Sequence, residues 1–275
     1  MWSTHVPELA IAANAVSLLM PHAEPYVVAS VRSALDDLTT TDPELAADAQ
    51  AYAAQEAQHH GQHRAFNEFL LARYPRLARI DRIEASIFRR LRARSGARSG
   101  TRSAAHPGSR APAGPDRFGL AFAAGFETIA FVAARWVDRH QRLLHDAEPT
   151  VATFFLWHLA EEVEHKEVAY EVYEAAGGGR LRYAAAMAVA AVVLAASSMV
   201  ATLVMLAAEG RLLSPVAHWR LLRWSLGFVL AALPVMVVSA LPGHHPRDLA
   251  DPVGLEHWLD HLDPATSTVP PWALP

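Results

Sequence analysis

Apolar residues recur at steps of three and four between residues 45 and 70, which predicts one continuous buried face of a helix. Three polar residues, Glu56, His59 and His63, lie on that face in register with its leucine and tyrosine side chains. A charged side chain on a buried face is costly unless it is paired or binds a metal. The Asp42–Pro43 pair predicts the start of this helix, because proline is favoured in the first helical turn. The helix is therefore expected to turn a polar patch toward the core.

A second segment, residues 151–172, repeats this pattern. His158, Glu162 and His165 interrupt its apolar face at spacings of four and three residues. Its start is predicted by Pro149 and its end by three consecutive glycines. Both segments thus carry a Glu-x-x-His pair on the side that is expected to be buried.

Two further segments each place one glutamate on an apolar face. Glu24 is the only glutamate between residues 9 and 43, and Glu127 is the only one between residues 85 and 147. Prolines on both sides of Glu24 predict that it stands in the first turn of its helix. One glutamate from each of two helices and one Glu-x-x-His from each of two others form the ligand set of two-metal sites in four-helix bundles.

The sequence therefore predicts an all-α, ferritin-like four-helix bundle with two metal ions in its core and an apolar helical hairpin after it. Two divalent cations would neutralise the four carboxylates. Mixed imidazole and carboxylate ligands suit iron, and also manganese or zinc, better than magnesium or calcium. Glu161 competes with Glu162, which we prefer because it keeps the spacing of the first pair. The predicted metal ligands are Glu24, Glu56, His59, Glu127, His158, Glu162 and His165.

Two other residues near these ligands have weaker predicted roles. His63 follows His59 by one helical turn and is expected to line the entrance of the site or to hydrogen-bond a ligand, with a role as a metal ligand as the alternative. Tyr52, one turn before Glu56, is expected in the core, with a hydrogen bond to a ligand as the alternative.

Four segments of the chain resemble a known bacterial family. They read SLLMPHAEPYVVASVR, QEAQHHGQHRAFNE, WHLAEEVEHKEVAYEVY and LPGHHP, and they are similar to a ferritin-like group catalogued as predicted metal-dependent hydrolases. The His-x-x-x-Glu-x-x-His run that starts at His158 is also similar to the non-haem di-iron arylamine N-oxygenases. This second resemblance implies dioxygen activation at two irons and carries over only to the seven predicted ligands.

Composition limits the remaining possibilities. A chain of 275 residues with 52% hydrophobic content can bury a sizeable core, and its net charge of −4 argues against a general nucleic-acid binder. The absence of cysteine excludes disulfides, thiolate ligands and iron–sulfur clusters. The N-terminus lacks the basic start and apolar core of a signal peptide, so we expect the bundle in the cytoplasm.

The chain divides into three predicted parts. Residues 1–176 form the bundle, and within them residues 93–116, rich in arginine, serine, glycine and proline, predict a flexible linker between two helix pairs. The alternative for this basic linker is contact with anionic lipid or nucleic acid. Residues 177–245 form the apolar hairpin, and residues 246–275 form a tail.

The hairpin contains two uncharged runs, residues 184–208 and 224–241. A helix that spans a bilayer needs about 20 apolar residues, so both runs are long enough to consider. Two interpretations stay open. The runs associate with a membrane as a hairpin that spans it, or they form an apolar pair that packs on the bundle or across a homodimer interface.

Function follows from the metal site rather than from any other motif. The first hypothesis is a di-iron oxidoreductase that activates dioxygen and oxidises a small organic substrate. The alternative is a hydrolase in which two ions, zinc or manganese, acidify a bound water that attacks an ester or a phosphate. A third hypothesis is a non-enzymatic bundle that handles iron.

Overall fold

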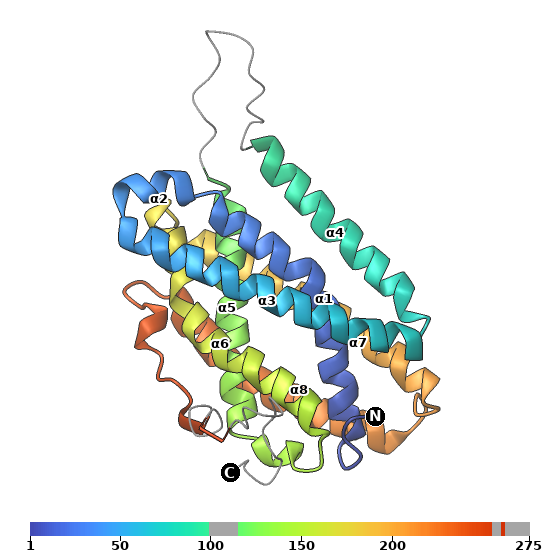
Figure 1. Ribbon diagram of the computed structural model, residues 1–275. Coiled ribbons are helices and arrows are strands. Elements are labelled where there is room, and N and C mark those ends of the chain that lie inside the picture. Colours follow the sequence, from blue (N-terminus) through green and yellow to red (C-terminus); the bar gives the residue numbers. More distant parts are fainter. Residues whose placement is uncertain (99–114, 255–259, 262–275) are drawn as a thin grey trace.

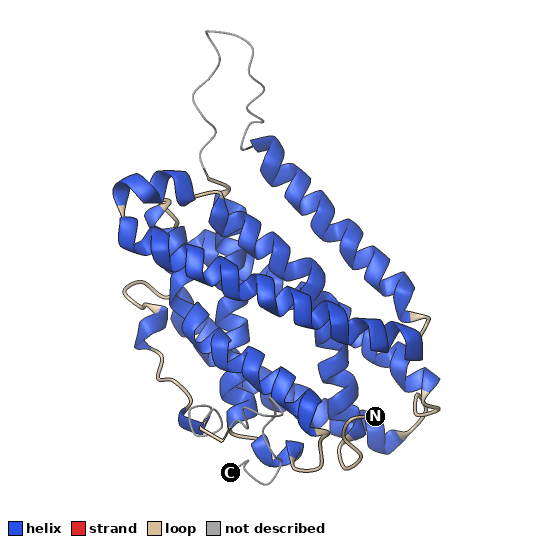
Figure 2. Ribbon diagram, viewed as in Figure 1, coloured by secondary structure: helices blue, strands red, loops and turns tan. Residues whose placement is uncertain are grey.

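The computed structural model describes residues 1–98, 115–254 and 260–261 (Figure 1). Throughout these residues the regular elements are helices, which confirms the predicted all-α fold (Figure 2). The α-helices are α1 (Pro7–Arg32), α2 (Leu35–Thr41), α3 (Pro43–Arg73), α4 (Leu77–Arg98), α5 (Arg117–Asp138), α6 (Pro149–Ala175), α7 (Arg180–Ala208) and α8 (Pro215–Ala240). Short 3-10 helices cover Gln141–Leu144 and Pro246–Asp248.

Six of the long helices pack in three layers, and α4 packs beside them against α1 and α7. α3 and α6 form one outer layer, α1 and α5 form the middle layer, and α7 and α8 form the other outer layer (Figure 1). The first two layers make a four-helix bundle, in which α1 pairs with α3, α5 pairs with α6, and the pairs meet through α1–α5 and α3–α6 contacts. This arrangement is compatible with the predicted ferritin-like bundle.

The starts of α3 and α6 follow from their caps. Asp42 accepts a hydrogen bond from the backbone N–H of Leu45, and Glu148 accepts one from that of Val151. Each cap satisfies an N–H group of the first turn that has no partner within its helix. A proline follows each cap residue, as the sequence predicted.

The course of α1 corrects the expectation for Glu24. The prolines on either side of it do not begin the helix, because Pro21 and Pro25 both lie within α1. Pro21 has no N–H group, so the carbonyl of Ser17 loses its helical partner. The side-chain amide of Asn67 on α3 donates to that carbonyl over 2.8 Å instead. Glu24 therefore lies well inside the helix rather than in its first turn.

α7 packs against the bundle and contributes to its buried core. Met187 belongs to the same buried cluster as Tyr26 of α1 and Phe122 of α5. At Gly125 an added Cβ would lie 2.6 Å from the Cα of Met187, so only glycine allows α5 and α7 this close approach. The sharp end of α6 also depends on glycine, because Gly177 has a φ of +72°.

Three helices, α5, α7 and α8, are long and apolar enough to cross a membrane by length and composition. They differ in how much of that apolar surface the protein covers. In the most apolar window of each, 78% of α5 is buried, whereas the figures for α7 and α8 are 28% and 6%. α5 is therefore a core helix, and α7 and α8 present an apolar outer surface.

We call this surface the α7–α8 face. Its exposed large apolar residues are Leu181, Val189, Val192, Met199, Val200 and Leu203 on α7 and Val216, Trp219, Leu222, Leu226, Val229, Leu230, Leu233, Val237 and Val238 on α8.

The predicted linker begins later than expected. α4 extends to Arg98, five residues past the predicted start of the linker at residue 93, and residues 99–114 lie outside the described part of the chain. Most of the predicted tail, namely residues 255–259 and 262–275, lies outside it as well.

Candidate metal centre

The bundle gathers all seven predicted ligands in its interior. α1 supplies Glu24, α3 supplies the first Glu-x-x-His pair, α5 supplies Glu127, and α6 supplies the second pair together with His158. None of the seven is more than 8% exposed. The burial of four carboxylates and three imidazoles in one core requires a charge or hydrogen-bond partner for each.

One group of ligand atoms lies between α3 and α6. It consists of Glu56, His59, Glu162 and His165, and one ligand atom from each lies within 4.8 Å of the others. Glu56 Oε1 is 3.1 Å from His59 Nδ1 and 3.0 Å from His165 Nδ1. Both imidazoles therefore turn Nδ1 toward the same carboxylate oxygen, which makes a mixed nitrogen and oxygen donor set around one point.

The opposite edges of these two imidazoles are held by other side chains. His59 Nε2 lies 2.6 Å from Glu161 Oε2, and His165 Nε2 lies 3.2 Å from Gln55 Oε1. A partner on the outer nitrogen fixes the orientation and tautomer of a metal-binding histidine. Glu161 thus lies on the outer side of His59, whereas Glu162 points into the group.

A second group joins the first along α6. It consists of Glu24, His63 and His158, and one ligand atom from each again lies within 4.8 Å of the others. His63 Nε2 is 2.7 Å from His158 Nδ1 and 3.7 Å from Glu24 Oε1. His158 Nε2 is 2.7 Å from Glu162 Oε1, so the two groups share a border.

The sequence did not reveal how His63 is held. Ser17 donates from its hydroxyl to Asn67 Oδ1 over 2.9 Å, and the same hydroxyl oxygen lies 2.8 Å from His63 Nδ1. The hydroxyl has one proton, so it accepts a hydrogen bond from Nδ1–H of His63, and Nε2 of His63 carries the lone pair that can bind a metal. The i, i+4 spacing of His63 and Asn67 indicates that the two side chains lie on one face of α3. Nothing in the sequence indicates that Ser17 of α1 joins them.

Glu127 stands beside the first group rather than within either one. The hydroxyl of Tyr52 donates to Glu127 Oε1 over 2.6 Å, and the carboxyl group of Glu127 contacts that of Glu162. Tyr52 is buried in the core, as expected, and also makes the hydrogen bond that was the alternative.

Without a bound cation, burial and the neighbouring negative charges oppose ionisation of the carboxyl groups. Burial and the charge of Glu56 hold the pKa of Glu24 well above its ordinary value, and burial with the charge of Glu162 does the same for Glu127. Burial also opposes ionisation of Glu162, but hydrogen bonds from His158 and His165 outweigh it and keep that pKa well below its ordinary value. Two of the four carboxyl groups therefore favour a proton when no cation is near.

The pKa values of the two histidines of the first group are raised. Burial disfavours their charged forms, but the hydrogen bonds of His59 to Glu161 and Glu56 raise its pKa to about 10. Hydrogen bonds to Glu162 and Glu56 raise the pKa of His165 to about 9 in the same manner. Protons thus balance the negative charge of this core, and a metal cation can replace them.

Among the described residues, four buried carboxylate oxygens of this core accept no hydrogen bond. They are both oxygens of Glu24, Oε2 of Glu127 and Oε2 of Glu162. Unsatisfied buried polar atoms are rare in proteins, and a cluster of them is typical of a site for an ion. The residues present therefore fit a metal site.

Aromatic residues border the histidine side of the cluster. The ring centroid of Trp157 is 5.1 Å from that of His59, and the centroid of Phe154 is 4.7 Å from that of His63. These side chains come from α6 and are partly exposed, so they separate the imidazoles from solvent. The low polarity on this side strengthens the electrostatic interactions inside the cluster.

The helical bundle and its buried glutamate–histidine core define a class of protein with a metal-dependent site. A family model described as "predicted metal-dependent hydrolase" matches residues 1–250, and the chain belongs to this family. No curated protein and no solved structure matches the chain. The resemblance to arylamine N-oxygenases finds no support in these comparisons.

Proposed function

We propose that the chain is a metal-dependent hydrolase whose catalytic centre is the glutamate–histidine core of the bundle. The observation that carries this proposal is the set of buried carboxylate oxygens that accept no hydrogen bond and lie beside buried imidazoles. Membership in a family of predicted metal-dependent hydrolases supports hydrolysis over other metal chemistry.

Two divalent ions fit the two groups of donor atoms. Glu56, His59, Glu162 and His165 would hold one ion, and Glu24, His63 and His158 would hold the other. Glu127 remains a predicted ligand through Oε2, because Tyr52 already occupies Oε1. His63 joins the ligand set that the sequence predicted.

Bound divalent ions would lower the pKa of a coordinated water and polarise the carbonyl of an ester or the phosphorus of a phosphate ester. The chain supplies the positioning for this chemistry. Glu161 and Gln55 fix the imidazoles of His59 and His165 from outside, and Tyr52 fixes Glu127. No protein nucleophile is needed, because the attacking group is water.

A test of this proposal uses the full chain loaded with zinc or manganese under anaerobic conditions. We expect hydrolysis of a chromogenic carboxylic or phosphate ester, loss of turnover on chelation, and recovery when the metal is returned. Zinc has no redox chemistry and dioxygen is absent, so turnover by the zinc-loaded protein can only be hydrolytic.

Two other results would favour the oxidoreductase or the iron-handling bundle instead. A ferrous protein that consumes dioxygen, with no anaerobic turnover on any ester, would contradict hydrolysis and favour the di-iron oxidoreductase. Repeated oxidation of ferrous iron with more than two ions retained per chain would favour the iron-handling bundle.

A further inference from the structure

The α7–α8 face is the largest feature of the molecule that the metal centre does not explain. Its apolar side chains follow one stripe on each helix, and exposed Leu226, Leu230 and Leu233 on α8 have no apolar cover from the described residues. Large contiguous apolar patches are rare on soluble monomers and mark surfaces that bind protein or membrane.

The packing of α7 shows how such a surface can meet a bilayer. Met187 and Met205 are both buried against the middle layer, and they stand 18 residues apart, or about 27 Å along the helix. A bilayer core is about 30 Å thick, so a membrane that α7 crossed would also enclose α1, α5 and the layer beyond them. That layer exposes charged residues such as Glu44, Asp48 and Arg64. The geometry therefore favours helices that lie along a membrane surface.

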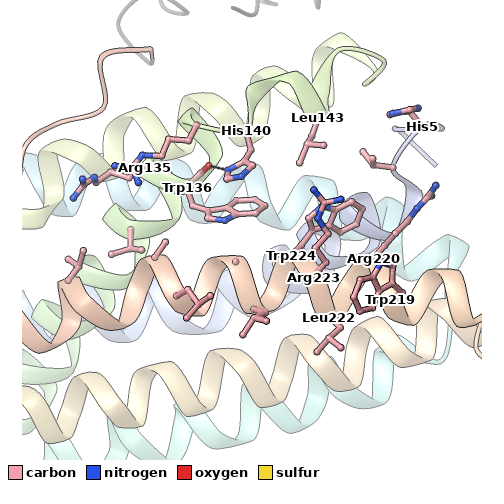
Figure 3. A pocket seen from close by; sticks show the side chains of 18 residues that line it. His5, Arg135, Trp136, His140, Leu143, Trp219, Arg220, Leu222, Arg223 and Trp224 are labelled. Carbon is pink, nitrogen blue, oxygen red and sulfur yellow. Dashed lines mark hydrogen bonds between the residues drawn. The ribbon is translucent and has the colours of Figure 1, made fainter.

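A cleft of about 950 Å³ opens between α5 and α8 beside this face (Figure 3). Figure 3 shows Trp136 and His140 on the α5 side, with Trp224 and Arg223 on α8. Leu230 and Val235 line its other end, and no acidic residue is among the described residues that line it. The cleft thus combines a cationic, aromatic part with an apolar part, which suits an anionic amphiphile.

The arginines of this cleft are available to a ligand. Arg220 shares the buried carboxylate of Glu8 with Arg211. Arg139 and Arg223, in contrast, are exposed and form no ion pair with any described residue. Two cations without counter-ions beside tryptophan rings form a site for an acidic headgroup.

The charge of the whole segment agrees with that of the cleft. Residues 175–246 contain five arginines and a single acidic residue, Glu209. Glu209 is already paired with Arg73 of α3 over 2.7 Å. Arg180 is paired with Glu174, and Arg211 and Arg220 share Glu8, whereas Arg182 and Arg223 are exposed and form no ion pair with any described residue. These two unpaired cations border the apolar surface and complement the negative surface of an acidic bilayer.

We propose that the α7–α8 face docks on an anionic phospholipid bilayer, with α7 and α8 in the plane of the interface and an acidic headgroup in the α5–α8 cleft. A second copy of the chain is a poorer occupant, because it would bring the same cationic surface to the interface. Like charges that face each other across an interface are unfavourable. The proposal does not depend on the metal centre or on its chemistry.

Co-sedimentation with vesicles tests this docking. The full chain is mixed with vesicles of phosphatidylcholine alone and with vesicles that also contain phosphatidylglycerol. We expect strong binding only to the acidic vesicles, and weaker binding as salt is added, because exposed charges are screened.

Paired variants test the cleft itself. Arg139→Gln and Arg223→Gln should each weaken vesicle binding about fivefold, the effect of one basic residue near an anionic surface. Arg142→Gln is the matched control, because Arg142 is exposed near the end of α5 but does not line the cleft. Unchanged circular dichroism and metal content would show that each variant is folded.

The absence of cysteine allows a test of orientation. Leu230→Cys on the α7–α8 face and Phe69→Cys on exposed α3 would each carry one environment-sensitive fluorophore. Acidic vesicles should shift the emission of the label at position 230 to the blue and leave the label at position 69 unchanged.

Four results would overturn the proposal. Equal binding of all arginine variants to acidic vesicles would exclude the cleft, and a blue shift at both labels would exclude docking in the plane. Binding of glycerol 1-phosphate without vesicle binding would assign the cleft to a soluble anion. A stable dimer in sedimentation, lost in Leu230→Asp and with no vesicle affinity, would assign the face to a second copy of the chain.

Discussion

The interior between α1, α3, α5 and α6 and the outer surface of α7 and α8 depart from the usual distribution of side chains in opposite ways. The interior buries four carboxylates and four histidines, whereas the outer surface exposes leucine, valine and tryptophan along two helices. Each arrangement is costly for the protein alone, because buried charges need partners and exposed apolar surface orders water.

The comparison shows that such departures indicate what the protein binds. Proteins break the rules of side-chain distribution mainly at functional sites. A cluster of charges inside calls for an opposite charge, which a metal cation supplies, and an apolar face bordered by arginine calls for an acidic amphiphilic surface. α5 belongs to both regions, because it carries Glu127 in the cluster and Trp136 in the cleft.

The largest expected effect comes from the carboxylate that joins the two groups of ligands. Glu162→Ala removes an oxygen that lies near both groups, so we expect loss of bound metal and of hydrolytic turnover by more than about 100-fold. Elemental analysis and an ester assay would measure this. Glu68→Ala, at an exposed position of α3, is the control and should retain both properties.

Removal of the metal should lower the stability of the whole fold. An ion present at about 100 times its Kd stabilises the folded state by about 2.7 kcal/mol. For a protein of this size that corresponds to a fall in Tm of about 5–10 °C on chelation. Thermal unfolding with and without a chelator measures it, and identical Tm values would contradict a metal centre in the core.

Glu161→Ala should weaken the centre without emptying it. The side chain of Glu161 holds the outer nitrogen of His59, and loss of such a partner weakens metal affinity about 10–100-fold. Competition with a chelator of known affinity measures the change. An effect as large as that of Glu162→Ala would mean that Glu161 is itself a ligand.

A lone buried carboxylate sharpens the contrast with the cluster. Glu84 of α4 is buried and accepts a hydrogen bond from Ser197 of α7. Burial raises its pKa, so the folded protein holds this proton more tightly than the unfolded chain does. Its contribution to stability is therefore complete below about pH 4.5 and is lost as the pH rises through the folded-state pKa.

Glu84→Gln should remove this dependence. We expect the variant to be more stable than the wild type at neutral pH by about 1 kcal/mol, since a partly unsatisfied buried charge is gone. The gain should vanish under acidic conditions. Chemical denaturation at both pH values measures the difference, and a loss of stability at neutral pH would show that the charge has a partner.

The smallest expected effect lies on the α7–α8 face. Leu230→Asp should change the free energy of unfolding by less than about 0.5 kcal/mol, because Leu230 is 64% exposed. Leu19→Asp, at a buried position of α1, should cost more than about 4 kcal/mol. Denaturant unfolding of both variants compares the two regions directly. A large loss in Leu230→Asp would mean that the face is covered in solution.

The sequence alone was sufficient to predict the helices that carry the site. Periodicity identified the faces of α3 and α6, and charged residues on those faces indicated a metal because burial without a partner is costly. The sequence was not sufficient to place Glu24 within its helix, because the neighbouring prolines are typical of a helix start. The contact between Ser17 and Asn67 that satisfies the backbone of α1 is tertiary and is not visible in the local sequence. For the same reason the pattern did not distinguish His63, which needs Ser17 of another helix, from a residue at the entrance.

The α7–α8 face shows a different limit. Composition identified two apolar runs, but the side of each helix that packs on the bundle depends on partners elsewhere in the chain. The close approach of α7 at Gly125 is one such contact, and it involves a residue far from either run. Exposure of α8 therefore became visible only with the fold.

The central claim is that the buried carboxylates and histidines hold two metal ions. The most direct test is a crystal structure of the full chain reconstituted with zinc, with anomalous scattering measured at the zinc edge. We predict two strong anomalous peaks inside the bundle, one beside Glu56 and His165 and one beside Glu24 and His63. A bundle interior without anomalous density, with peaks only at exposed histidines such as His145, would contradict the account.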